Sequence, residues 1–584
     1  MKTHTHQLKT LTLAILIGLA AACSSERTDV AATGQTAQTT EADTPQEIVT
    51  ESHESEIRQS TLQRVAEEKN GIAYDSSLYP TPTAAPLRVD DFRLAREELY
   101  RERYQHPDDN QTLRVGEFPV STFSIDVDTG AYSNMRRWVN QGSLPPQDAV
   151  RVEELINYFD YDYEPPRHTD RPFSVKTEIG ATPWNPDTHL LRIGIQGYDV
   201  PAADLPASNL VFLVDVSGSM QSQDKLPLLK QALSLLTRKL DANDTISIVV
   251  YAGASGIVLD SAHGDRNATI ISALEQLEAG GSTNGAAGIR LAYSLARQNF
   301  KEDGVNRVIL ATDGDFNVGV ANTEELIDLV ERQRHSGIAL TTLGFGSGNY
   351  NDHMLEQLAD AGNGNHAYID KLSEAQKVLS DEMSATLLTI AKDVKIQVEF
   401  NPSTVSEYRL IGYENRALNE EDFNNDRVDA GEIGAGHSVT ALYEINLVGS
   451  GYQRLPERRY GQAETARTRT SDHADELAEL RIRYKLPREE NSRLIETAIL
   501  SSEVNQRPGT ESPDFRFAAA VAAFGQKLRG GEYLGTLCWD DIRKLAGQAR
   551  GTDPFGYRGE FLQLVSLAGS HDSLGACGSA VTKN

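Results

Sequence analysis

Apolar runs and amphipathic patterns alternate between residues 204 and 392. A short, branched-rich apolar run such as 210–214 is typical of a strand that is buried on both faces. Residues 226–240 instead place Leu229, Leu233 and Leu236 on one face of a helix. The same reading gives strands at 245–251, 307–312, 338–343 and 365–369, and helices at 267–277, 285–298, 323–334, 350–361 and 373–390. Strands that alternate with helices predict an α/β domain with a doubly wound, mostly parallel sheet.

Patterns of half-buried strands flank this α/β region on both sides. Leu191, Ile193 and Ile195 alternate with other residues before it, and similar stretches follow at 394–401, 437–448 and 477–486. The roughly thirty residues on the N-terminal side are too few for an independent sheet domain. We therefore predict one antiparallel β domain, residues 169–203 and 393–487, with the α/β domain (204–392) inserted in it. Two separate β domains are the alternative.

The remaining folded parts are expected to be helical. In an N-terminal module, residues 89–168, helices are expected at 89–107, from Ala131 onward, and at 148–159. Asp128 or Thr129 would cap the second of these helices, and we prefer this interpretation of Asp126 and Asp128 to a metal or phosphatase site. A C-terminal helical module, residues 488–584, is expected to hold helices at 493–500, 515–530, 539–550 and 560–569. Its apolar run 517–524 is too short to span a membrane and predicts a buried helix.

The N-terminus reads as a targeting signal. Lysines precede an apolar run at 11–22 that is shorter than the ~20 residues of a membrane span, so we predict a signal peptide at 1–22. Cys23 follows small residues and resembles the lipidated cysteine of bacterial lipoproteins, although Ala20 stands where that motif usually has Leu. An unmodified secreted protein is the alternative. By the same analogy, Ser24 and Ser25 favour outer-membrane sorting. Residues 23–88 are rich in small polar residues and predict a disordered tether.

Charge and cysteine content add two constraints. The formal net charge of -28 argues against nucleic acid as a partner, because nucleic acids select basic surfaces. Only Cys538 and Cys577 remain after Cys23. In an oxidising envelope compartment they can form a disulfide, and two free buried thiols are the alternative.

Oxygen donors collect where strands of the α/β domain end. Asp215, Ser217 and Ser219 form a D-x-S-x-S pattern directly after the first buried strand. Thr283 lies in a polar loop before a helix, and Asp313 ends a later strand. Ligands of open α/β sheets bind beyond the carboxyl ends of the strands. Carboxylate and hydroxyl oxygens suit hard cations, so the three motifs together predict a Mg²⁺ site.

This constellation resembles the metal-ion-dependent adhesion site (MIDAS) of the von Willebrand factor A (VWA) domain, a Rossmann-like fold. The resemblance covers residues 204–392. The wider order of motifs, with FSIDVDTGAYS at 123–133 and WNPDTHLLRIGIQG at 184–197, is similar to the YfbK-like group of bacterial VWA lipoproteins. The resemblance implies the role of each residue. Ser217, Ser219 and Thr283 would ligate Mg²⁺, with Ca²⁺ or Mn²⁺ as alternatives, while Asp215 and Asp313 would hold its waters or bind it directly.

The resemblance also implies a binding role. Neutral hydroxyl ligands leave the ion electron-poor, and Mg²⁺ takes six oxygens, so a protein partner can complete the site with a carboxylate. No general base stands in these motifs, and the nearby His353 and His366 read as structural, so we expect no enzyme. The predicted function is a lipid-anchored cell-envelope protein, on the periplasmic or surface face, that touches the membrane only through its lipid. A metal-independent envelope scaffold, or a chelatase-like assembly factor that works with an ATPase, are the alternatives.

Overall fold

The computed structural model describes residues 101–572, except 107, 168–170, 202–203, 283–284, 315–322, 457, 460–472, 506 and 508. These residues belong to one compact unit, Leu87–Asn584. The predicted signal peptide, Cys23 and the tether lie outside the described residues and stay predictions. Within the described part of the chain, no helix is both long and apolar enough to cross a membrane.

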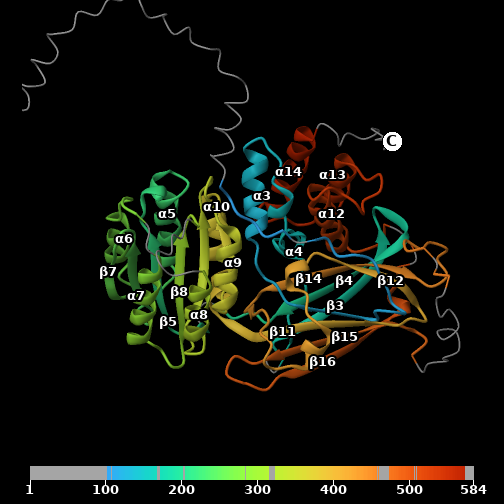
Figure 1. Ribbon diagram of the computed structural model, residues 1–584, viewed down its shortest axis with the longest axis horizontal. Helices are drawn as coiled ribbons and strands as arrows, with labels where there is room; N and C mark the ends of the chain where they lie inside the picture. The colour runs from blue at the N-terminus through green and yellow to red at the C-terminus, as the bar shows by residue number, and fades with distance from the viewer. Residues whose placement is uncertain are drawn as a thin grey trace, which may run out of the picture. The chain divides into compact units, whose positions relative to one another are not determined.

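A six-stranded sheet forms the centre of the α/β domain, in the order β10-β9-β8-β5-β6-β7 (Figure 1). All neighbouring strands are parallel except β6 and β7, which are antiparallel. The strands are β5 (Ser208–Asp215), β6 (Thr245–Tyr251), β7 (Ser255–His263), β8 (Val305–Thr312), β9 (Ala339–Phe345) and β10 (His366–Ile369). The sequence reading missed β7, because this edge strand is mostly exposed and lacks an apolar run.

Helices cover both faces of this sheet. The helices are α5 (Leu226–Thr237), α6 (Asn267–Glu275), α7 (Gly285–Gln298), α8 (Thr323–Arg334) and α9 (Asp352–Ala361). Phe212 and Val214 of β5 belong to the core shared with α5 and α6, whereas Val211 and Leu213 belong to the core shared with α7, α8 and α9. Successive side chains of a strand point to opposite faces, so β5 is buried on both sides. The predicted doubly wound sheet is confirmed.

The last helix of the α/β domain differs from the prediction. The expected helix 373–390 consists of α10 (Leu372–Gln376), a π-helical turn (Lys377–Asp381) and α11 (Met383–Leu387). Ile390 already belongs to the next strand, where it is buried in the β-domain core. Apolar spacing alone could not locate this change, because the same residues fit a helix face.

Two antiparallel sheets form the β domain around one apolar core. The first sheet has the order β1-β12-β14-β4-β3, and the second has β13-β11-β15-β16, with β2 also paired to β11. β4 precedes the α/β domain and β14 follows it, and the two strands pair with Ile193 opposite Ala441. The predicted insertion of the α/β domain into a β domain is therefore confirmed. The strands are β1 (Leu113–Arg114), β2 (Val120–Ser124), β3 (Phe173–Thr182), β4 (Asn185–Gly197), β11 (Thr389–Phe400), β12 (Val405–Ile411), β13 (Ile433–Gly434), β14 (Ser438–Leu447), β15 (Glu476–Lys485) and β16 (Arg493–Leu500).

The helix predicted at residues 493–500 is wrong, because this stretch is the strand β16. Leu494, Ile495, Ala498 and Ile499 have a spacing that also fits a helix. In the structure β16 pairs with β15 along its length, with Ile495 opposite Ile482. Pairing with the preceding strand therefore decided the structure of a locally ambiguous segment.

The two helical modules share one apolar core. α3 (Gly130–Asn140) and α4 (Val152–Asn157) pack with α12 (Pro513–Leu528), α13 (Trp539–Gln548) and α14 (Tyr557–His571). The apolar run 517–524 is buried in α12, as predicted. The helix predicted at 148–159 is shorter than expected, with only a 3-10 turn at Gln147–Ala149 before α4. Residues 101–106 are not helical, so the described end of the predicted helix 89–107 is wrong.

The prediction that Asp128 or Thr129 caps α3 is right in position but wrong in the expected side-chain hydrogen bond. Thr129 is the N-cap residue, but its side chain makes no capping hydrogen bond. The carboxylate of Glu154 on α4 instead accepts the backbone N–H of Ala131 at 2.7 Å. The capping acceptor therefore comes from another helix, which no local pattern reveals.

Asp126 and Asp128 are buried partners of an arginine. Arg416 lies 3.3 Å from Asp126 and 3.5 Å from Asp128, and Asp128 also accepts the backbone N–H of His366 at 2.8 Å. Burial and the neighbouring Asp126 charge raise the pKa of Asp128 well above its usual range. The two aspartates therefore join three parts of the fold: the segment after β2, the loop after β12, and strand β10 of the α/β domain.

Candidate metal centre

The Asp215 carboxylate is held at the end of β5 by groups from two neighbouring strands and from the turn that follows β5. Asp215 is fully buried. Its Oδ1 accepts the Ser217 backbone N–H at 2.8 Å, and its Oδ2 accepts the hydroxyls of Thr312 at 2.8 Å and Tyr251 at 3.2 Å. Burial raises the pKa of Asp215 to about 6. The three hydrogen bonds therefore fix the orientation of a carboxylate that is buried away from water.

Two hydroxyl groups lie together in the turn after Asp215. Ser217 Oγ and Ser219 Oγ are 3.0 Å apart, and Ser217 is buried whereas Ser219 is partly exposed. Adjacent ligands of an octahedral Mg²⁺ ion, each at ~2.1 Å, lie about 3 Å from one another. The spacing of the two hydroxyls therefore fits two neighbouring positions around one Mg²⁺ ion.

The loop that precedes Thr283 lies against this turn. The Gly218 N–H donates to the Gly281 carbonyl at 3.1 Å, and the Gly280 N–H donates to the Val216 carbonyl at 2.8 Å. These two hydrogen bonds join the first and second predicted motifs at the backbone. Thr283 itself lies outside the described residues, so its role as a ligand stays a prediction.

Asp313 follows the last residue of β8 and is fully buried. Its Oδ2 accepts hydrogen bonds from the Lys225 ammonium at 2.9 Å and from the Asn349 side-chain amide at 3.1 Å. The sequence reading missed both partners. Lys225 reads as a solvated residue before a helix, and Asn349 reads as part of the turn after β9. The preceding glycine-rich stretch marks that turn but not its contact with Asp313.

The donor set defines which metals could bind. Among the residues that the structure describes, no group of three or more His, Cys, Asp or Glu side chains could hold a metal ion. The candidate site has two carboxylates, and it depends on hydroxyl oxygens for the rest. Oxygen-only ligands of this kind fit Mg²⁺, Mn²⁺ or Ca²⁺ better than zinc or copper. Asp215, Ser217, Ser219 and Asp313 therefore suit a hard cation.

His366 has the contacts of a structural histidine. It is buried in β10, and its ring nitrogens lie 2.8 Å from the Thr342 and Tyr350 hydroxyls. The side chain of Asp352 also lies 3.4 Å from the His366 ring. These neighbours occupy both ring nitrogens within the packed domain.

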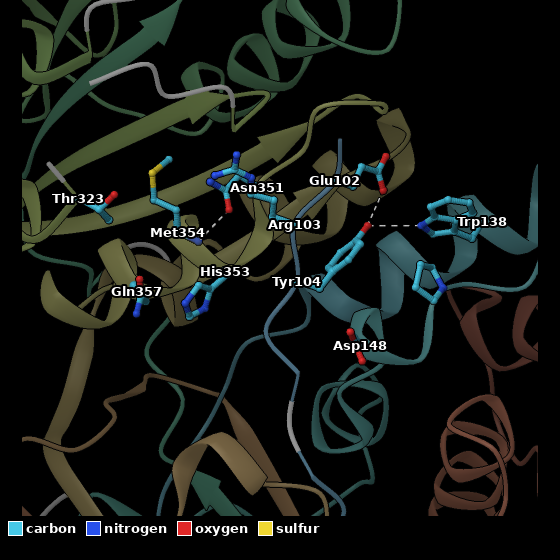
Figure 2. Close-up of a pocket in the computed structure, with 11 residues that line it drawn as sticks. Glu102, Arg103, Tyr104, Trp138, Asp148, Thr323, Asn351, His353, Met354 and Gln357 are labelled. Atoms are coloured by element: carbon cyan, nitrogen blue, oxygen red, sulfur yellow. Dashed lines mark hydrogen bonds between the residues drawn. The ribbon is translucent and has the colours of Figure 1, made fainter. Parts of the chain in front are cut away.

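A cavity of about 630 Å³ lies between residues 102–104, Trp138 of α3 and residues 351–357 at the start of α9. Figure 2 shows the Tyr104 hydroxyl between Glu102 and Trp138: it donates to the Glu102 carboxylate at 2.5 Å and accepts from Trp138 Nε1 at 3.4 Å. Asn351 lines the opposite side and lies directly against Gly314, where an added Cβ would be 2.4 Å from the Asn351 backbone nitrogen. The wall of the cavity therefore contacts Gly314, the residue that follows Asp313.

Three family models match successive parts of the chain. The model for the von Willebrand factor type A domain matches residues 209–382. A second von Willebrand factor model matches residues 98–192. The model described as uncharacterized protein YfbK, C-terminal, matches residues 385–570. The matched regions therefore include the α/β domain and the segments on both sides of it.

Similar proteins are found among both known sequences and solved structures. The chain is 50% identical over 472 residues to uncharacterized protein YfbK of Escherichia coli (strain K12), covering 80% of this chain and 81% of that protein. It is 25% identical to human inter-alpha-trypsin inhibitor heavy chain H3 over 262 residues, which cover 41% of this chain and 28% of that protein. The solved structure of von Willebrand factor type A from Catenulispora acidiphila matches with a TM-score of 0.38 and 14% identity, over 67% of this chain and 89% of that chain. The chain belongs to the YfbK family of proteins with a von Willebrand factor type A domain.

Proposed function

We propose that this protein binds a divalent cation, in the first place Mg²⁺, and uses it to bind a protein partner. Ser217, Ser219 and Thr283 would supply hydroxyl ligands, and Asp215 and Asp313 would bind the ion or its waters. The observation that carries the proposal is the pair of hydroxyls 3.0 Å apart beside the buried Asp215 carboxylate. VWA domains commonly mediate protein interactions, which supports a binding role rather than an enzymatic one.

The electrostatics of the site favour an acidic group on the partner. Bound Mg²⁺ would supply a centre of positive charge that attracts oxygen anions. The two hydroxyls place oxygen ligands around it without adding negative charge. Asp215 is held by Thr312, Tyr251 and the Ser217 backbone, so it need not move when an ion binds. A carboxylate on a partner protein could then complete the ligand set.

We also propose that the protein is anchored in the bacterial cell envelope, at the outer membrane, by a lipid on Cys23. The proposal rests on the apolar run that ends in Ala-Ala-Ala-Cys at residues 20–23. Cys23→Ser should release the protein from the membrane fraction. Unchanged fractionation together with an N-terminal peptide that lacks an acyl mass would contradict the anchor.

Calorimetric titration with Mg²⁺ tests the metal site directly. Asp215→Ala should abolish measurable Mg²⁺ binding, and Thr283→Ala should weaken it less because water can replace one neutral ligand. Asp260→Ala, at an exposed position on β7, is the matched control and should bind like wild type. Thermal melts in EDTA show whether each variant is folded.

Capture from an envelope extract tests the second part of the proposal. Wild-type protein should retain partners in Mg²⁺ and lose them in EDTA, and the Asp215→Ala variant should retain none of these partners in either buffer. Partners that bind equally in both buffers and to both proteins would contradict the metal-dependent adhesion site. They would favour the alternative function, a metal-independent envelope scaffold.

A further inference from the structure

The ammonium group of a buried lysine lies within the candidate metal centre. Lys225, the residue before α5, is only 6% exposed. Its ammonium donates to Asp313 Oδ2 and to Asn349 Oδ1, both at 2.9 Å. Asn349 in turn donates to the same Asp313 oxygen at 3.1 Å. The lysine, asparagine and aspartate side chains are thus joined to one another by hydrogen bonds at the end of β8.

The position of the Lys225 side chain is built into the neighbouring turn. It packs under the turn after β9, where a Cβ added at Gly346 would lie 2.3 Å from Lys225 Cγ and Cε. Gly346 also has a φ of +74°, which a residue with a side chain rarely adopts. The Tyr368 hydroxyl donates to the Gly346 carbonyl at 2.5 Å and holds the turn in place. A glycine therefore leaves the space that the lysine fills.

The charge of Lys225 acts on the same carboxylates that would attract a metal ion. A buried carboxylate is costly unless a counter-charge accompanies it, and Lys225 supplies that charge to Asp313. Two ionised aspartates would present a charge of -2 to an incoming cation, and the ammonium reduces this to -1. A fixed positive charge also repels a divalent cation a few ångströms away, because few water molecules screen the interaction in a buried site.

We infer that Lys225 is a built-in counter-ion of the metal centre, which stabilises the site without metal and lowers its affinity for Mg²⁺. This inference rests on the proposed metal site and concerns its strength. An ion that binds beside Lys225 is neutralised less by the protein. It therefore keeps more positive charge for the carboxylate of a partner.

The inference predicts opposite effects of one substitution on stability and on metal binding. Lys225→Met keeps the side-chain length and removes the charge. In EDTA its melting temperature should fall below that of wild type, because Asp313 loses its cation. Its affinity for Mg²⁺ should rise at least tenfold, or about 1.4 kcal/mol. Added Mg²⁺ should therefore raise the melting temperature of the variant more than that of wild type.

Three further variants complete the experiment. Each is measured by calorimetric titration with Mg²⁺ and by thermal melting. Lys225→Gln removes the charge but keeps a hydrogen-bond donor, so it should also bind Mg²⁺ more tightly, even where Lys225→Met does not fold. Lys225→Arg keeps the charge and should show no gain. Lys230→Met, on the same helix with its ammonium on the Glu275 carbonyl, should leave Mg²⁺ affinity unchanged.

The outcomes separate this inference from the proposed function. If wild type binds Mg²⁺ and both uncharged variants bind no tighter, the inference is overturned and Lys225 only positions Asp313. If neither wild type nor any variant binds Mg²⁺, the proposed metal site fails and the inference fails with it. A gain in both uncharged variants that is absent from Lys225→Arg supports the counter-ion role.

Discussion

The Thr312 hydroxyl donates a hydrogen bond of 2.8 Å to Asp215 Oδ2, across the two neighbouring parallel strands β8 and β5. Thr312 is fully buried, and the residue that follows it is Asp313. One hydrogen bond therefore links the two carboxylate-bearing ends of the candidate metal centre. It also explains why the centre needs a threonine at a position that reads as part of an apolar strand.

Thr312→Val should weaken both the domain and its metal site. Valine has nearly the shape of threonine but cannot donate to Asp215, and a buried carboxylate that loses a donor costs roughly 1–3 kcal/mol. Urea denaturation should show a loss of free energy of unfolding in that range, and calorimetry should show weaker Mg²⁺ binding. Thr312→Ser keeps the hydroxyl and should remain close to wild type in metal affinity. Equal Mg²⁺ affinities for the serine and valine variants would show that this bond does not orient Asp215.

Much of the candidate site could be predicted because its signals are local. The apolar run of β5 is buried on both faces, and the oxygen donors follow at its carboxyl end, where parallel sheets bind ligands. Asp215, Ser217 and Ser219 therefore stood out without a structure. Lys225 and Asn349 did not, because each is an ordinary polar residue until the turn after β9 brings it to Asp313.

Contacts between separate segments also explain why some elements of the fold were predicted wrongly. β16 is a strand because β15 is beside it, and its apolar spacing fits a helix equally well. The acceptor for the first turn of α3 comes from Glu154 on α4, although Asp128 is closer in sequence. In both cases a contact with a neighbouring element outweighed the local preference.

Arg136→Met should destabilise the protein strongly. Arg136 on α3 is fully buried and lies 2.5 Å from Asp370, 2.6 Å from Glu374 and 3.0 Å from Glu560. Removal of the arginine leaves buried carboxylates without their counter-charge, which typically costs about 3–5 kcal/mol. Denaturant titration measures the loss. Adding Glu374→Gln to the variant should restore part of the stability, whereas a double variant as unstable as the single one would point to lost packing instead of unpaired charge.

Loss of the disulfide at Cys538 should lower stability in a recognisable way. Cys538 is disulfide-bonded in the structure, and Cys577 lies outside the described residues. Cys538→Ser and Cys577→Ser should each cost about 2–4 kcal/mol, and a reducing agent should lower the melting temperature of wild type only. Peptide mapping without reduction identifies the bridge. Two thiols labelled in the unfolded, unreduced protein would contradict it.

Glu153 on α4 gives the fold a dependence on pH. It is fully buried, and burial raises its pKa to about 8, with further contributions from the nearby carboxylates of Glu414, Asp126 and Glu154. The backbone N–H of Tyr413 has the opposite effect and lowers the pKa. Glu153 is therefore protonated in the folded protein at neutral pH, whereas a glutamate in the unfolded chain is ionised above pH ~4.5.

The sign of the effect follows from these two pKa values. The stability that Glu153 contributes is fully present below pH ~4.5 and is lost as the pH rises to about 8. Over this interval one such group lowers the free energy of unfolding by about 1.4 kcal/mol per pH unit. Denaturant titrations between pH 5 and 8 should show a shallower fall for Glu153→Gln than for wild type, by roughly this amount. Glu275→Gln, at an exposed position on α6, is the control and should keep the wild-type slope. Identical slopes for Glu153→Gln and wild type would mean that Glu153 is already ionised in the folded protein, where Arg416 and Arg151 of the neighbouring ion pairs would have to compensate its charge.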